Sequence, residues 1–74
     1  MKVLLIGKEG CGKCNQAKAL LKKRNIKYKY LDVKTVDGMA ELTYYGEDGR
    51  VLPVIVVNNK VFISVIEAIK TIQG

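Results

Sequence analysis

The chain has no histidine or tryptophan, one proline and only two cysteines among its 74 residues. Without histidine, one chain cannot supply the four ligands of a Cys/His zinc site. A disulfide between Cys11 and Cys14 would close a very small loop and would hardly constrain the unfolded chain. A structural disulfide therefore explains the pair poorly, and stability must come from the 49% hydrophobic content.

Long apolar stretches are also missing. No run approaches the ~18 apolar residues of a membrane helix. The first apolar run, Val3–Ile6, is followed at once by Gly7-Lys8-Glu9, so it is too short for a secretory signal. We therefore expect no membrane partner and a cytoplasmic location, where thiols stay reduced. In that setting a close cysteine pair indicates redox or metal chemistry.

Acidic residues are scarce in the first half of the chain. Residues 1–34 hold ten Lys/Arg and two acidic residues, whereas residues 35–74 hold three Lys/Arg and five acidic residues. The basic half would attract an acidic protein, a thiol tripeptide with carboxylates, or nucleic acid, and it equally fits a solvated lysine-rich surface. No basic-aromatic motif accompanies the four tyrosines, so we expect no nucleic-acid partner.

The length allows one small domain, residues 1–74, which we expect to be a monomer. Periodicity and turn residues predict strands at 3–6, 26–31, 54–57 and 60–63, and helices at about 12–24, within 33–45 and from 65 onward. The order β-α-β-α-β-β-α predicts an α/β fold: a four-stranded mixed sheet with helices on both faces. The first two strands should be parallel, and the last two should form a hairpin at Asn58-Asn59.

The segment Cys11-Gly12-Lys13-Cys14 follows the first strand and begins the first helix. A thiol at a helix N-terminus faces unpaired backbone N–H groups and the positive end of the helix dipole, and both favour the reactive thiolate. Lys8 and Lys13 add positive charge nearby. We expect Cys11 to be the exposed nucleophile and Cys14, one turn further, to be the resolving thiol. The competing interpretation is a pair of small buried core residues.

Together these features resemble the glutaredoxins of the thioredoxin superfamily over nearly the whole chain. The segment from Lys8 to Cys14 is similar to the family's lysine, two spacer residues and active-site C-x-x-C. Val51-Leu52-Pro53 is similar to the family's Thr-Val-Pro, in which the proline is cis, although local sequence alone favours trans. Arg50 falls where many members have a basic or polar residue. The resemblance implies a dithiol–disulfide oxidoreductase, with Lys8 on a glutathione carboxylate and the Leu52 backbone paired with substrate.

Two departures from the family pattern bear on substrate binding. Gly12 and Lys13 stand where the family usually has a proline and an aromatic residue. Ile63 and Ser64 stand where it has a Gly-Gly pair that helps to seat glutathione. Ser64 can still cap the last helix, but the Ile63 side chain is expected to crowd the groove. No bound cofactor is expected, and the electron donor is either glutathione or a flavoprotein of the thioredoxin-reductase type.

Two other functions compete with disulfide reduction. Two thiolates suit Cu(I), and copper chaperones also place C-x-x-C after the first strand, but they run β-α-β-β-α-β. A dimer that bridges an iron–sulfur cluster is a related possibility. In the second alternative, the cysteines are incidental to a protein-interaction or nucleic-acid-binding module.

Overall fold

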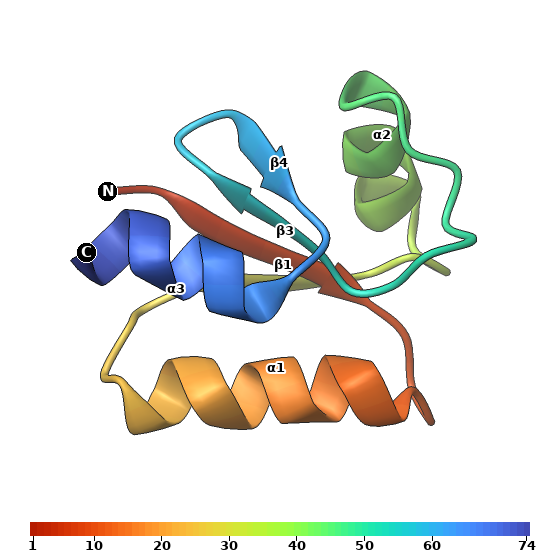
Figure 1. Cartoon of the computed structure of the whole chain (residues 1–74). Helices are drawn as coiled ribbons and strands as arrows, with labels where there is room; N and C mark the ends of the chain where they lie inside the picture. Colours follow the sequence, from red (N-terminus) through yellow and green to blue (C-terminus); the bar gives the residue numbers. More distant parts are fainter.

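The computed structural model describes residues 1–74 and contains four strands and three helices in the predicted order (Figure 1). The elements are β1 (Val3–Gly7), α1 (Gly12–Lys23), β2 (Lys29–Asp32), α2 (Val36–Tyr44), β3 (Val54–Val57), β4 (Lys60–Phe62) and α3 (Val65–Gln73). The predicted α/β class and element order are confirmed.

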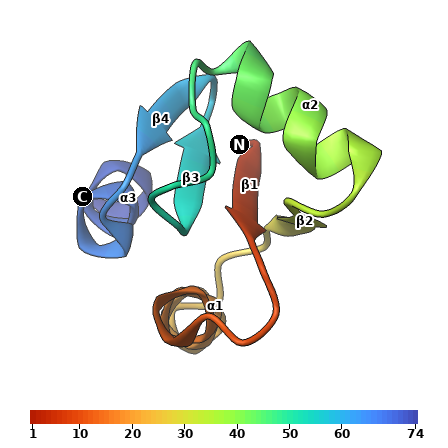
Figure 2. The same cartoon turned by 90° about the vertical axis from the view of Figure 1, so that its right-hand side faces the viewer.

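The strands form one mixed sheet in the order β2-β1-β3-β4 (Figure 2). β1 pairs in parallel with β2 and antiparallel with β3, and β3 pairs antiparallel with β4. The hairpin turns at Asn58 and Asn59, whose positive φ angles of 48° and 73° suit asparagine. Both predicted pairings are therefore confirmed.

Helices cover both faces of the sheet, which explains why β1 and β3 read as continuous apolar runs. Figure 2 shows α1 and α3 on one side of the sheet and α2 on the other. The α1/α3 side buries Val3, Leu5, Ala17, Leu21, Ile55, Val57, Ala68 and Ile69. The α2 side buries Leu4, Ile6, Leu42, Val54 and Val56. The sheet is thus held between two apolar layers, and its central strand β1 leads directly to the cysteine loop.

Several element boundaries differ from the predicted ones, most of them by one residue. The strand predicted at 26–31 begins only at Lys29, because β1 starts at Val3 and pairs from Leu4 onward, leaving residues 26–28 without a strand partner. The strand predicted at 60–63 ends at Phe62. The ambiguous region 33–45 contains α2, which Thr35 caps by accepting a hydrogen bond from the N–H of Gly38 at 3.0 Å.

The chain ends in the helix α3, whereas the order typical of copper chaperones ends in a strand. The topology therefore does not favour that alternative. None of the three helices has the length and apolar character that crossing a membrane requires.

Candidate active site

Cys11 lies at the end of the loop after β1 and caps α1. Its backbone is extended, with φ −89° and ψ 111°, and the helix begins at the next residue, Gly12. The Cys11 sulfur accepts a hydrogen bond from the backbone N–H of Cys14 at 3.2 Å. A sulfur in this position satisfies an N–H group that the first helical turn leaves unpaired. The predicted location of Cys11 at the start of the helix is confirmed.

The two thiols differ in exposure and in acidity. Cys11 is partly exposed, whereas Cys14 is fully buried. A hydrogen bond from the Cys14 thiol lowers the pKa of Cys11, and partial burial opposes this effect. The backbone N–H groups of Cys14 and Lys13 and the charge of Lys8 lower the pKa further. Burial raises the pKa of Cys14, and its hydrogen bond to Cys11 raises it further. Cys11 is therefore the more readily ionised of the two thiols.

Gly7, the last residue of β1, allows Cys14 to lie against the sheet. A Cβ atom at Gly7 would stand 2.8 Å from the Cys14 sulfur, which is closer than real contacts allow. The absence of a side chain here is therefore a packing requirement of the active-site helix.

A hollow of about 230 Å³ lies beside the cysteine turn, lined by Lys13, Gln16, Leu20, Pro53, Ile63, Ser64 and Val65. The Leu52–Pro53 peptide bond is cis, as the resemblance implied. Ile63 is 44% exposed. Ser64 caps α3 by accepting a hydrogen bond from the N–H of Glu67 at 3.5 Å. The structure thus gathers four of the predicted substrate-binding residues around one hollow.

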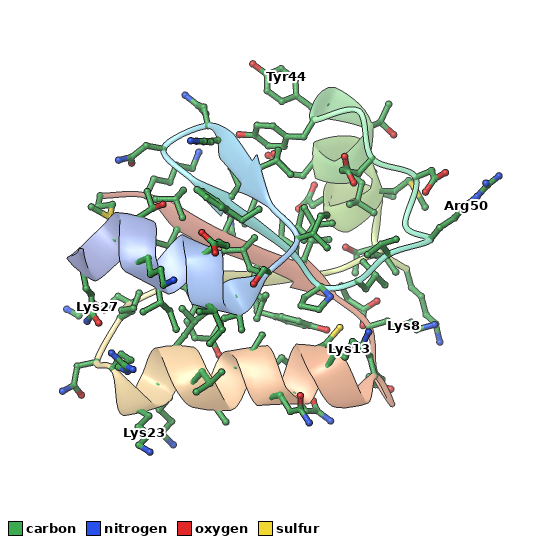
Figure 3. The ribbon with its side chains drawn as sticks, in the orientation of Figure 1. Lys8, Lys13, Lys23, Lys27, Tyr44 and Arg50 are labelled. Atoms are coloured by element: carbon green, nitrogen blue, oxygen red, sulfur yellow. The ribbon has the colours of Figure 1, made fainter.

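The other predicted binding residues lie around this region in different ways. Gly12 is exposed in the first turn of α1, with open space where a Cβ would stand. Lys8 lies close enough to Cys11 for its charge to lower the pKa of that thiol. Figure 3 shows Arg50 extending away from the body of the protein. The Arg50 guanidinium pairs with Asp48 at 3.1 Å, and both side chains are exposed. Leu52 packs its side chain on the α2 side of the sheet, just before strand pairing begins.

Tyr30 lies at this site, although the sequence pattern did not single it out as a site residue. Its ring edge is 3.5 Å from the point where a Gly7 Cβ would stand, and the Cys14 sulfur is 2.8 Å from the same point. The alternating pattern places Tyr28 and Tyr30 on one face of the segment. Only the pairing of Tyr30 with Leu5 of β1 brings it near the cysteines. That pairing is not local in the sequence.

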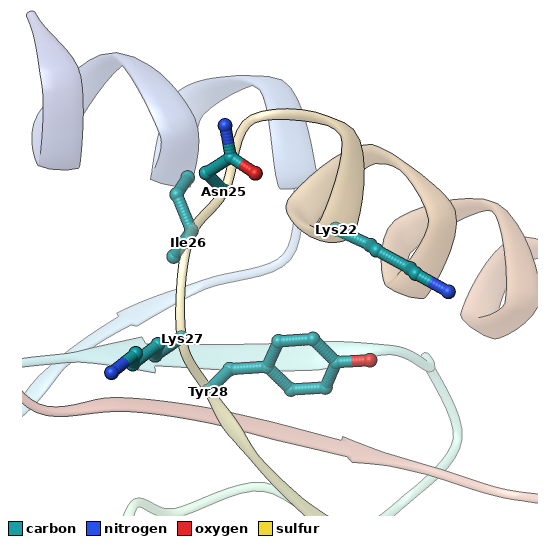
Figure 4. A pocket seen from close by; sticks show the side chains of 5 residues that line it. All are labelled: Lys22, Asn25, Ile26, Lys27 and Tyr28. Atoms are coloured by element: carbon teal, nitrogen blue, oxygen red, sulfur yellow. The ribbon is translucent and has the colours of Figure 1, made fainter.

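A second hollow, of about 670 Å³, lies at the far end of α1. Figure 4 shows the side chains that line it, namely Lys22, Asn25, Ile26, Lys27 and Tyr28. These residues carry positive charge but no thiol or carboxylate. This hollow therefore has no group that could carry out the predicted chemistry.

Several solved structures share this fold over nearly the whole chain. The thioredoxin-like protein BC3987 is 25% identical with a TM-score of 0.81, and the match covers 97% of this chain and 100% of that chain. The glutaredoxin-like protein NrdH-redoxin from Escherichia coli is 18% identical with a TM-score of 0.79, covering 100% and 97%. Buckwheat glutaredoxin in its glutathione complex is 20% identical with a TM-score of 0.69, covering 96% and 67%.

The comparison with curated proteins gives no match. The family model for glutaredoxin matches residues 3–63, a span that runs from β1 through the cysteines and the cis-proline to the end of the β3–β4 hairpin. The chain therefore belongs to the glutaredoxin family.

Proposed function

We propose that this chain is a dithiol–disulfide oxidoreductase that reduces disulfides of proteins or small molecules through Cys11 and Cys14. The observation that carries the proposal is that two thiols one helical turn apart differ in exposure and in the direction of their pKa shifts. Cys11 is partly exposed with a lowered pKa, and Cys14 is buried with a raised pKa. Membership of the glutaredoxin family supports a thiol-redox function.

The reaction proceeds in two exchanges. The Cys11 thiolate attacks one sulfur of the substrate disulfide, the substrate S–S bond breaks, and the released thiolate takes up a proton. Cys14 then loses its proton, and its thiolate attacks the Cys11 sulfur of the mixed disulfide. This expels the second substrate sulfur as a thiolate, which takes up a proton, and forms the Cys11–Cys14 disulfide. Two electrons pass to the substrate, so an external donor must reduce the pair again.

The hollow beside Pro53 is the proposed place for the substrate segment that flanks the attacked sulfur. Lys13 supplies positive charge at its edge, and Ile63 supplies apolar surface. Leu52 lies outside the β1–β3 pairing, which reaches only to Val54. We infer that its backbone pairs with an extended substrate. A protein substrate would thus add a short strand next to the reacting sulfurs.

For the electron donor, we propose a flavoprotein of the thioredoxin-reductase type in preference to glutathione. The exposed Ile63 side chain lines the hollow where the family's glycine pair would leave room for glutathione. Among the structural neighbours, the Escherichia coli NrdH-redoxin is described as a glutaredoxin-like protein with a thioredoxin-like activity profile. The test compares NADPH consumption with thioredoxin reductase against consumption with glutathione and its reductase.

Trapping tests the thiol roles directly. Each cysteine variant is incubated with a disulfide-containing protein and analysed by mass spectrometry under non-reducing conditions. Cys14→Ser should accumulate a mixed disulfide through Cys11, because the resolving thiol is gone. Cys11→Ser should accumulate none. An equal yield of adduct from both variants, or no adduct from either, would contradict the proposed function.

A further inference from the structure

The hydroxyl of Tyr30 is buried and has no hydrogen-bond partner. Buried hydroxyl groups are nearly always paired, because removing one from water without a partner is costly. An unpaired donor at this position is available to an acceptor that forms next to it. The sulfurs of the active site are the groups beside it whose charge changes.

The Tyr30 ring and the Cys14 sulfur lie over the same glycine. A Cβ at Gly7 would stand 3.5 Å from the ring edge and 2.8 Å from the sulfur, so the missing side chain lets both approach. β2 brings the ring there by pairing Tyr30 with Leu5 and its neighbour Leu31 with Ile6. The contact therefore follows from the sheet register.

Lys18 completes the arrangement from the helix. It lies one turn after Cys14, and its ammonium nitrogen is 3.8 Å from the centroid of the Tyr30 ring. Its positive charge lowers the pKa of Cys14, in opposition to the larger effect of burial. One lysine thus contacts the tyrosine ring and favours the thiolate of the resolving cysteine.

The charged groups around Tyr30 come from three elements. Burial raises the pKa of its hydroxyl, and the negative charges of Asp32 on β2, Glu9 in the loop and the two cysteines raise it further. Cys14 itself faces Cys11 and Lys18 on α1 and the backbone of Lys8 in the loop. The Tyr30 hydroxyl therefore stays protonated, and remains a donor, over the range in which the thiols titrate.

We propose that Tyr30 and Lys18 are positioning residues for the resolving step, in which they stabilise the Cys14 thiolate. This inference rests on the proposed oxidoreductase function. When Cys14 loses its proton, the Tyr30 hydroxyl donates to the sulfur the hydrogen bond that it lacks in the dithiol state. Lys18 holds the ring in place and supplies the opposite charge. The thiolate then attacks the Cys11 sulfur, the bond from Cys11 to the substrate breaks, and the substrate leaves as a thiolate that takes up a proton.

Lys22 and Tyr28 form a matched pair for control. Lys22 follows Lys18 by one turn, and Tyr28 precedes Tyr30 on the same face of its segment. Both line the far hollow, away from the cysteines (Figure 4). Tyr28→Phe and Lys22→Met therefore remove the same chemical groups without touching the proposed arrangement.

The experiment uses Ellman's reagent, an aromatic disulfide, with the reduced full-length protein in stopped flow. The first release of coloured thiol reports attack by Cys11. The second release, independent of reagent concentration, reports resolution by Cys14. Tyr30→Phe should leave the first phase unchanged and slow the second about tenfold at neutral pH, the scale of one hydrogen bond to a charged group. The pH midpoint of the second phase should rise. Lys18→Met should act in the same direction, and both control variants should match the wild type.

A second phase in Tyr30→Phe and Lys18→Met with the wild-type rate and midpoint would overturn the inference. So would equal slowing by the control variants. If Tyr30→Phe does not fold, as judged by circular dichroism, Lys18→Met decides the matter, because it changes only a partly exposed charge. Absence of the first phase in the wild type would instead overturn the oxidoreductase proposal itself, and this inference with it.

Discussion

The two ends of α1 contain similar parts and differ in chemical capacity. Each end has a helix lysine and a tyrosine of the following segment, Lys18 with Tyr30 and Lys22 with Tyr28, and each lies near a hollow. The far hollow is the larger, at about 670 Å³ against about 230 Å³. Only the cysteine end combines thiols with unpaired helix N–H groups.

This difference indicates that helix polarity, and not the size of a hollow, decides where the proposed chemistry lies. At the N-terminal end, the dipole and the free N–H groups favour an anion, here the Cys11 thiolate. At the C-terminal end, the same dipole favours cations, and Lys22 and Lys23 occupy the last turn. The lysines of the far end are therefore explained by helix stability, without a ligand.

The largest expected effect contrasts the two ends directly. Cys11→Ser should lower the rate of disulfide reduction on the order of a thousandfold or more, because it removes the first nucleophile. Lys22→Met, at the far end, should retain the wild-type rate. Turnover of insulin disulfides with an excess of a dithiol reductant measures both. Comparable activity in the two variants would show that the cysteine end is not the reactive one.

A glycine pair tests how tightly the cysteine end is packed. Gly7→Ala should destabilise the reduced protein by about 1–3 kcal/mol, the usual cost of overpacking, because its Cβ would lie 2.8 Å from the Cys14 sulfur. Gly12→Ala should be neutral or slightly stabilising, since its Cβ meets no atom within 4 Å. Urea unfolding measures both. Equal stability of the two variants would contradict the close approach of Cys14 to β1.

Glutathione binding should be sensitive to the Ile63 and Ser64 side chains at the hollow beside Pro53. Ile63→Gly combined with Ser64→Gly should tighten glutathione binding about tenfold, the scale on which one pocket side chain discriminates ligands. Ile66→Ala alters an isoleucine of similar exposure, 51% against 44%, outside that hollow, and should leave binding unchanged. Calorimetric titration distinguishes them. Equal affinity in the wild type and the double variant would remove Ile63 as the obstacle.

The smallest effect concerns the charge of Lys8. In Cys14→Ser, whose hydroxyl can still donate to Cys11, the pH midpoint for alkylation of Cys11 should lie below that of a free thiol. The lowered pKa keeps Cys11 reactive at pH values where a free thiol is already protonated, and the rate falls only as pH drops through that lowered value. Adding Lys8→Met should raise the midpoint slightly, and adding Lys22→Met should not. A midpoint at or above the free-thiol value would contradict the lowered acidity.

Local signals predicted most of the fold. The C-x-x-C turn and the Asn58-Asn59 hairpin are each decided by a few neighbouring residues, and both lie where the pattern placed them. The start of β2 could not be predicted in the same way, because it depends on where β1 begins to offer hydrogen bonds. Strand ends are set by the partner strand as much as by their own sequence.

The candidate site shows the same division. The cap position of Cys11 follows from local sequence, because a helix must begin within the motif. The contact of Tyr30 with the cysteine end depends on a parallel register between segments that are separated by the whole of α1. An alternating strand pattern identifies the face on which Tyr30 lies, but not the residue across from it. The unpaired hydroxyl of Tyr30 can be recognised only from the three-dimensional structure.

The cap on α1 also links the redox state of the protein to its stability. In the reduced state, the Cys11 sulfur accepts the N–H of Cys14 and lies at the positive end of the helix dipole, and its lowered pKa favours the ionised form. Oxidation removes the ionisable thiol and leaves a neutral sulfur. Folding and reduction then form a thermodynamic cycle, so any free energy by which the cap favours the folded dithiol raises the reduction potential equally. At about 30 mV for each 1.4 kcal/mol, the unfolding of the two redox forms measures how far the helix raises the reduction potential of this pair.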